Sequence, residues 1–127
     1  MKTKLVYFLV AIFASLTIIS CNRDNDDSGS NSYPKQVSVV YKVTSTTVTA
    51  ATLVQYKNET GANTDVPNAA LPYTKTFNRT VNKNDVLSLG YGTNTSQTVK
   101  LEILVNNVSV KTQTFTSTAG AITYTFN

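Results

Sequence analysis

The sequence predicts an all-β domain, an antiparallel sandwich of two sheets over residues 36–127. From Val37 to Thr44, apolar and polar residues alternate, with Val37, Val39, Tyr41 and Val43 on one face, as in a half-buried strand. Turn signals separate several runs of this kind, and no helical period competes with them. About seven strands in roughly 90 residues are typical of an immunoglobulin-like sandwich, and a small closed β-barrel is the alternative.

A hairpin is expected after the first strand. Residues Val48–Lys57 are rich in β-branched and aromatic side chains, and Asn58–Gly61 is a turn signal. The remaining strands are expected at Thr74–Val81, Val86–Tyr91, Thr98–Val105, Val108–Phe115 and Ala121–Phe126.

A second turn is expected at Asn106-Asn107, because asparagine tolerates the positive φ that a two-residue type I′ turn requires. This turn fixes a register in which apolar residues meet apolar residues and opposite charges meet each other. The expected pairs are Val105 with Val108, Ile103 with Val110 and Glu102 with Lys111.

Residues 1–20 have the composition of a secretory signal peptide. Lys2 and Lys4 precede the uncharged apolar stretch Leu5–Ile19. As a helix this stretch spans only about 22 Å, less than the ~30 Å hydrocarbon core of a bilayer. Ser20 supplies a small residue before the expected cut, and Ile18-Ile19-Ser20-Cys21 matches the cleavage and lipidation box of bacterial lipoproteins.

Cys21 is the only cysteine, and its thiolate is a nucleophile that can accept a diacylglyceryl group. Residues 21–35 then form a polar, flexible tether. Its residues Asp24, Asp26 and Asp27 resemble the surface-export signal of Bacteroidota lipoproteins, and a merely solubilising linker is the alternative. The expected location is the bacterial cell envelope, with the chain lipid-anchored to the outer membrane and either periplasmic or surface-exposed.

Composition argues against several classes of function. Without Lys2 and Lys4, nine basic residues remain against seven acidic ones, a net charge of +2. The basic residues are scattered singly, so no nucleic-acid partner is expected. Asp24, Asp26 and Ser28 share the spacing of a calcium loop, but Lys35 stands where a bidentate glutamate is needed, so no metal site is expected.

No catalytic residues and no cofactor are expected. The chain has no histidine, and a lipidated Cys21 leaves no free thiol. Residues 36–127 contain four carboxylates with no spacing that suggests a catalytic pair, namely Glu59, Asp65, Asp85 and Glu102. The protein is therefore expected not to be an enzyme.

Tyrosines are the remaining candidates for contact with a ligand or partner. Tyr73 lies beside Pro72, and Tyr91 lies between Gly90 and Gly92. These neighbours are typical of strand ends, so both rings are expected to be exposed.

Four segments in succession resemble the small mycobacterial membrane protein family (MmpS) and its lipoprotein relatives. They are Val39–Thr44, Val54–Gly61, Leu71–Tyr73 and Leu101–Asn107. Tyr73 stands where that family usually has tryptophan, and Asn107 stands where it usually has glycine. The paired cysteines of mycobacterial members are missing, and a lipid anchor replaces their transmembrane helix.

The resemblance implies an extracytoplasmic immunoglobulin-like domain, accessory in some members to a large exporter of lipids or siderophores. The expected function is therefore that of a lipid-anchored interaction or transport-accessory domain, with an envelope transporter as its partner. The alternative is a surface-displayed module that binds a glycan or lipid through Tyr73 and Tyr91.

Overall fold

The computed structural model describes residues 32–127, and residues Tyr33–Asn127 form one compact unit. This unit consists of six antiparallel strands. They are β1 (Lys35–Ser45), β2 (Ala50–Lys57), β3 (Asn63–Ala70), β4 (Tyr73–Val81), β5 (Val86–Val105) and β6 (Val108–Thr125). The all-β class predicted from the sequence is confirmed.

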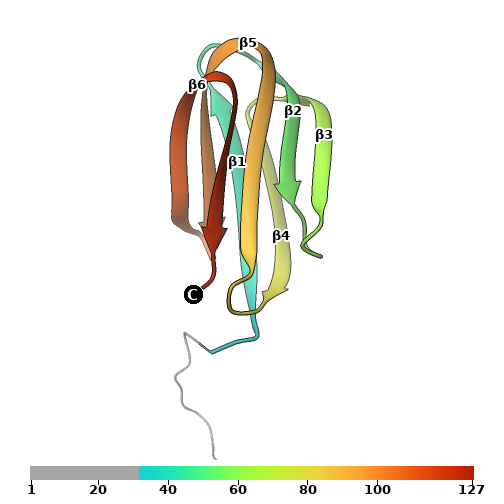
Figure 1. Ribbon diagram of the computed structural model, residues 1–127, viewed down its shortest axis with the longest axis vertical. Helices are drawn as coiled ribbons and strands as arrows, with labels where there is room; N and C mark the ends of the chain where they lie inside the picture. The colour runs from blue at the N-terminus through green and yellow to red at the C-terminus, as the bar shows by residue number, and fades with distance from the viewer. Residues whose placement is uncertain (1–31) are drawn as a thin grey trace, which may run out of the picture. The chain divides into compact units, whose positions relative to one another are not determined.

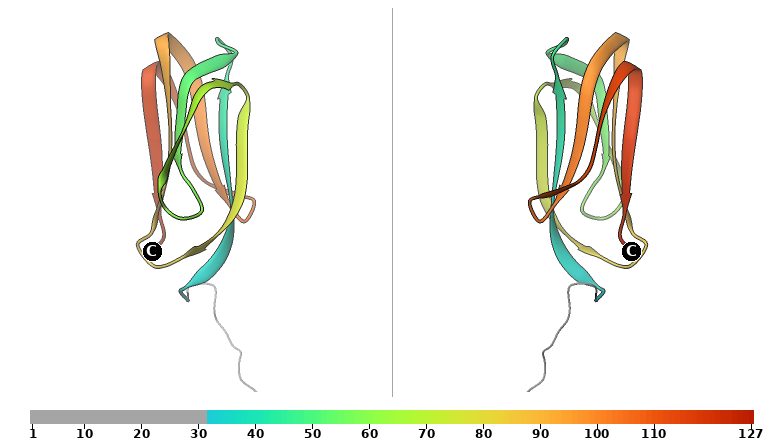
Figure 2. Two further views of the ribbon diagram at one scale, coloured as in Figure 1. Left: turned by 90° about the vertical axis from the view of Figure 1, so that its right-hand side faces the viewer. Right: turned by 90° about the vertical axis from the view of Figure 1, so that its left-hand side faces the viewer.

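The strands form one hydrogen-bonded sheet that curls into two facing layers (Figure 1). The path through the sheet is β3-β2-β5-β1-β4, with β6 paired to β5. The first half of β5 pairs with β2 and the second half pairs with β1, so β5 belongs to both layers. β6 follows β5 through the same bend (Figure 2). A curled sheet of this kind is consistent with both the sandwich and the small barrel.

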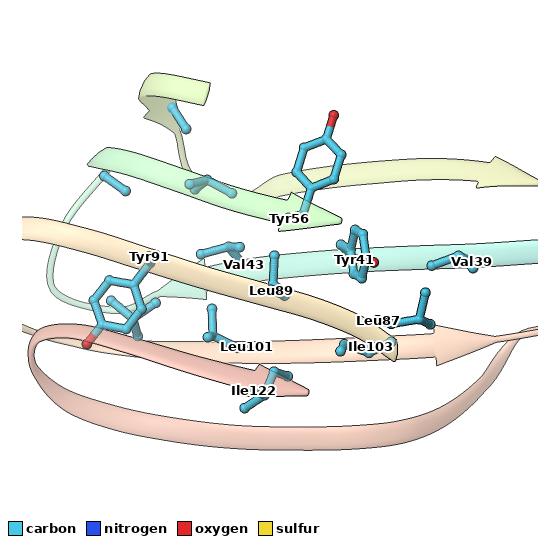
Figure 3. Packing of buried hydrophobic residues seen from close by; sticks show 14 of the residues in the cluster. Val39, Tyr41, Val43, Tyr56, Leu87, Leu89, Tyr91, Leu101, Ile103 and Ile122 are labelled. Atoms are coloured by element: carbon cyan, nitrogen blue, oxygen red, sulfur yellow. The ribbon is translucent and has the colours of Figure 1, made fainter. Parts of the chain in front are cut away.

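The core lies between the two layers and is entirely apolar or aromatic. The predicted inward face of β1 is confirmed, because Val37, Val39, Tyr41 and Val43 are all buried. In Figure 3, Tyr41, Leu89 and Leu101 point into the space between the layers. Within residues 32–127, no polar or charged residue is fully buried.

Two strands are longer than the sequence predicts. Val86–Tyr91 and Thr98–Val105 are halves of β5, and Val108–Phe115 and Ala121–Phe126 fall almost wholly within β6. Hydroxyl groups satisfy backbone carbonyls at the bend: Thr93 Oγ1 donates to the carbonyl of Thr95 at 2.8 Å, and Ser117 Oγ donates to that of Ala119 at 2.7 Å. Because threonine and serine side chains can form hydrogen bonds with nearby backbone carbonyls, β5 and β6 both bend and remain in the sheet.

The Asn106-Asn107 turn is confirmed, since both residues have positive φ, 51° and 67°. Val105 pairs with Val108 as predicted, but the rest of the predicted register is wrong. A bulge between Ile103 and Leu104 shifts the pairing by one residue. Ile103 therefore pairs with Lys111 instead of Val110, and Glu102 pairs with Thr112 instead of Lys111. The bulge allows Val110 to pack against the core.

Gly120 is required by close packing at the bend of β6. A Cβ atom on Gly120 would lie 2.6 Å from Cγ of Phe115, whose ring covers this backbone. We expect Gly120→Ala to lower the free energy of unfolding by about 1–3 kcal/mol, because the base of the ring must shift. Gly92→Ala is the matched control: its Cβ would meet only Leu53 Cβ, at 3.9 Å. Urea unfolding that finds Gly120→Ala no less stable than Gly92→Ala would contradict this packing.

Candidate functional site

The residues predicted to carry lipidation and export lie outside the described part of the chain. Cleavage after Ser20, lipidation of Cys21 and the export role of Asp24, Asp26 and Asp27 therefore stay predictions. Tyr33 OH donates a hydrogen bond to the carbonyl of Asn127 at 2.9 Å. Both ends of the domain thus lie together.

Tyr91 is buried, so the prediction that its ring is exposed was wrong. Only 5% of its surface is accessible, and its ring points into the core beside β6 (Figure 3). The hydroxyl donates to the carbonyl of Ser117 at 2.9 Å, and the ring lies 6.1 Å from that of Phe115. The flanking glycines do not mark a strand end; they occupy the alternate positions of a continuous strand.

A hollow with a volume of ≈ 480 Å³ lies on the outer face of β2, β5 and β6. Two rows of cross-strand neighbours line it. Leu53, Gly92 and Ala119 form one row, and Gln55, Gly90 and Ala121 form the other. Because glycine and alanine have almost no side chain, the sheet itself is the floor of the hollow. The sequence contains a signal for this floor, because Gly90 and Gly92, like Ala119 and Ala121, are spaced by two.

A second, smaller hollow of ≈ 230 Å³ lies on the outer face of β1, β5 and β6. Four threonines, one serine and one lysine line it: Thr44, Ser45, Thr46, Thr98, Lys100 and Thr114. Ser45 Oγ already donates to the carbonyl of Thr98 at 2.7 Å and accepts from the amide of Thr47 at 3.1 Å. The serine hydroxyl therefore stabilises the turn after β1 by hydrogen bonding.

Charged groups have structural roles where their contacts are known. Arg79, whose side chain is 9% exposed, pairs with Asp85 at 3.5 Å between Nη2 and Oδ2. Asp85 Oδ2 also accepts from the amide of Asn82 at 2.9 Å, and Asp65 accepts from Gln55 Nε2 at 2.7 Å. Within residues 32–127, no three metal-ligating side chains cluster.

Comparison with known families shows the family to which the chain belongs. The family model described as Mycobacterium membrane protein matches residues 2–127, nearly the whole chain. The chain belongs to this family. The predicted resemblance is thereby confirmed, and membership in a family of membrane proteins is consistent with a general role in the cell envelope. No curated protein gives a significant match. In the described part of the chain, we find no helix that could span a membrane.

Residues from two of the four segments that carry the resemblance meet, together with Phe77, in one aromatic cluster. The ring of Tyr41 on β1 lies 5.4 Å from that of Tyr56 on β2 and 5.6 Å from that of Phe77 on β4. Tyr73, in the third segment, is the first residue of β4. Its side chain is half-buried and packs against the core. Tyrosines from three of the four segments therefore contribute to the packing of the core.

Burial raises the pKa of Tyr73 to about 12, and the neighbouring Tyr56 adds to the increase by its charge and by a hydrogen bond. Burial also raises the pKa of Tyr41. These raised values mean that the folded state disfavours tyrosinate. The contribution of Tyr73 to stability is complete below the ordinary value of 10.0 and is lost as the pH rises from there to about 12.

We therefore expect the urea midpoint of the protein to fall between pH 10 and about 12. Tyr73→Phe, which cannot ionise, should show a smaller fall over the same range. Equal falls in the two proteins would contradict the burial of this hydroxyl. Tyr33→Phe is the control, because that hydroxyl bonds at the exposed chain end.

Proposed function

We propose that this protein is a lipid-anchored component of the cell envelope that acts as an interaction domain accessory to a membrane transporter. The observation that carries the proposal is the family match over residues 2–127. The lipidation box ending at Cys21 supports anchoring by acyl chains, and two or more chains hold a protein stably on a bilayer. The domain has an apolar core, and Val108 is the one large hydrophobic residue exposed among residues 32–127; a largely polar surface of this kind suits a binding module. No catalytic step is assigned to it.

The location we propose is the outer membrane, with Asp24, Asp26 and Asp27 as a surface-export signal. The alternative function, binding of a glycan or lipid by exposed tyrosines, is weakened by the burial of Tyr91. Tyr73 alone remains for that role, and its ring is half-buried.

Cross-linking in native membranes followed by affinity purification tests the transporter proposal. The full chain should enrich one transporter, and Cys21→Ala should lose that enrichment because the domain no longer reaches the membrane. An unrelated lipoprotein serves as the control for bystanders on the same membrane. If the chain recovers only what this control recovers, the proposal fails. Retention on cell-surface polysaccharide that Tyr73→Ala abolishes would favour the alternative.

A further inference from the structure

One edge of the sheet is open and unusually free of charge. Within residues 32–127, β6 pairs with β5 and with no other strand, and Figure 1 places β6 on the opposite side of the domain from β3. The edge at β3 carries Asp65 and Pro67, and the edge at β4 carries Lys75 and Arg79. Charges and proline are the usual means by which proteins prevent a further strand from pairing with an edge.

The two halves of β6 differ in this protection. The first half contains the bulge next to Val110 and the ammonium group of Lys111, both of which oppose strand pairing. The second half, Phe115–Thr125, contains no proline and no Lys, Arg, Asp or Glu. Only this second half is therefore an unprotected edge.

The backbone of this half offers regular hydrogen-bonding groups to a further strand. The amide of Phe126 bonds to the carbonyl of Asp85, toward β5. Because the direction of these groups alternates along an antiparallel strand, Ile122 and Tyr124 also bond toward β5. Ala121, Thr123 and Thr125 then present their amide and carbonyl groups to the open edge.

The larger of the two hollows, on the outer face of β2, β5 and β6, adjoins this same half of β6. Ala119 and Ala121 form its border beside the open edge, and Gly90 and Gly92 form its floor. Over Gly92 the space is open, because a Cβ there would meet only Leu53. On the inner face, the ring of Phe115 covers the glycine backbone at Gly120. An aromatic or large aliphatic side chain from a strand beside β6 could cover Gly92 in the same way.

We propose that the edge Ala119–Thr125 and the adjoining hollow form a strand-addition site for an extended, uncharged segment of another polypeptide. The backbone of that segment would pair with β6, and one large apolar side chain would occupy the hollow. The absence of charged residues from this edge favours an uncharged segment. A charged strand would lose hydration there and would meet no opposite charge. A second copy of β6 fits less well, since its outer face brings only alanine and threonine and leaves the hollow empty. The inference is independent of the lipid anchor and of any transporter.

The test uses the mature chain with Cys21→Ser and the peptide Thr-Val-Thr-Phe-Thr-Val-Thr. Amide hydrogen exchange by NMR should show fast exchange at Ala121 and Thr123 in the free protein and slowed exchange once the peptide is bound. Ile122 should be protected throughout. The peptide with serine in place of phenylalanine should bind roughly tenfold or more weakly.

Two variants test the contribution of the hollow and that of the edge separately. Gly92→Val fills the hollow without meeting a backbone atom at its Cβ and should weaken binding of the Phe peptide but not of the Ser peptide. Thr123→Pro removes an amide that points away from β5 and should abolish binding of both peptides, whereas Thr123→Val should bind normally. Protection of Ile122 in each variant verifies the fold.

The proposal is overturned if the peptide protects no amide of Ala119–Thr125, or if Gly92→Val binds both peptides as well as the parent does. It is also overturned if Ala121 and Thr123 are protected without peptide in a dimer that Thr123→Pro dissociates. That outcome would assign the edge to a second copy of the chain.

Discussion

Truncation of Tyr41 to alanine should remove a large part of the stability of the domain. The side chain is fully buried between the rings of Tyr56 and Phe77. Its loss leaves a cavity the size of an aromatic ring, and such truncations cost about 3–5 kcal/mol. A domain of this size has roughly 5–15 kcal/mol in total. Urea unfolding followed by far-ultraviolet circular dichroism measures the change, since the chain has no tryptophan.

Tyr41→Phe separates the ring from the hydroxyl group. The hydroxyl donates to the carbonyl of Lys57 at 2.8 Å, which ties β1 to the end of β2. Losing this bond should cost about 1–3 kcal/mol, less than losing the whole ring. Equal losses in Tyr41→Ala and Tyr41→Phe would mean that the ring contributes nothing by packing, which contradicts the structure.

The sequence predicts well those features of the fold that depend on neighbouring residues. Alternation gives the inward face of β1, and two asparagines that tolerate positive φ give the turn at Asn106-Asn107. β3 has no such local signal, because Pro67 and Asn68 interrupt it, and only its pairing with β2 maintains it as a strand. The bulge beside Val110 likewise depends on packing across the layers, so the predicted register fails there.

Surface features were harder to predict because they depend on topology. Glycines beside Tyr91 are compatible with a strand end, and only the continuity of β5 shows that the ring is buried. The hollow combines residues from β2, β5 and β6 that are far apart in the chain. Whether β6 lies at an edge depends on the order of the strands in the sheet, and the pattern of hydrophobic residues does not determine that order.

Replacement of Cys21 by alanine should abolish membrane attachment of the protein. Without the thiol no thioether can form, so the acyl chains that we propose as the anchor are never added. Fractionation of cells should find the wild-type chain with membranes, and Cys21→Ala either in the soluble fraction or retained with an uncut leader. Tyr73→Phe is a control that leaves the leader unchanged. Cys21→Ala that stays with membranes in a cut form would contradict lipid anchoring.

The mass of the mature chain purified from membranes tests the central claim most directly. Anchoring through Cys21 predicts a chain that lacks residues 1–20 and carries a diacylglyceryl group on its first residue, with further fatty acid on the new N-terminus. An intact leader, or a chain cut before an unmodified Cys21, would contradict it.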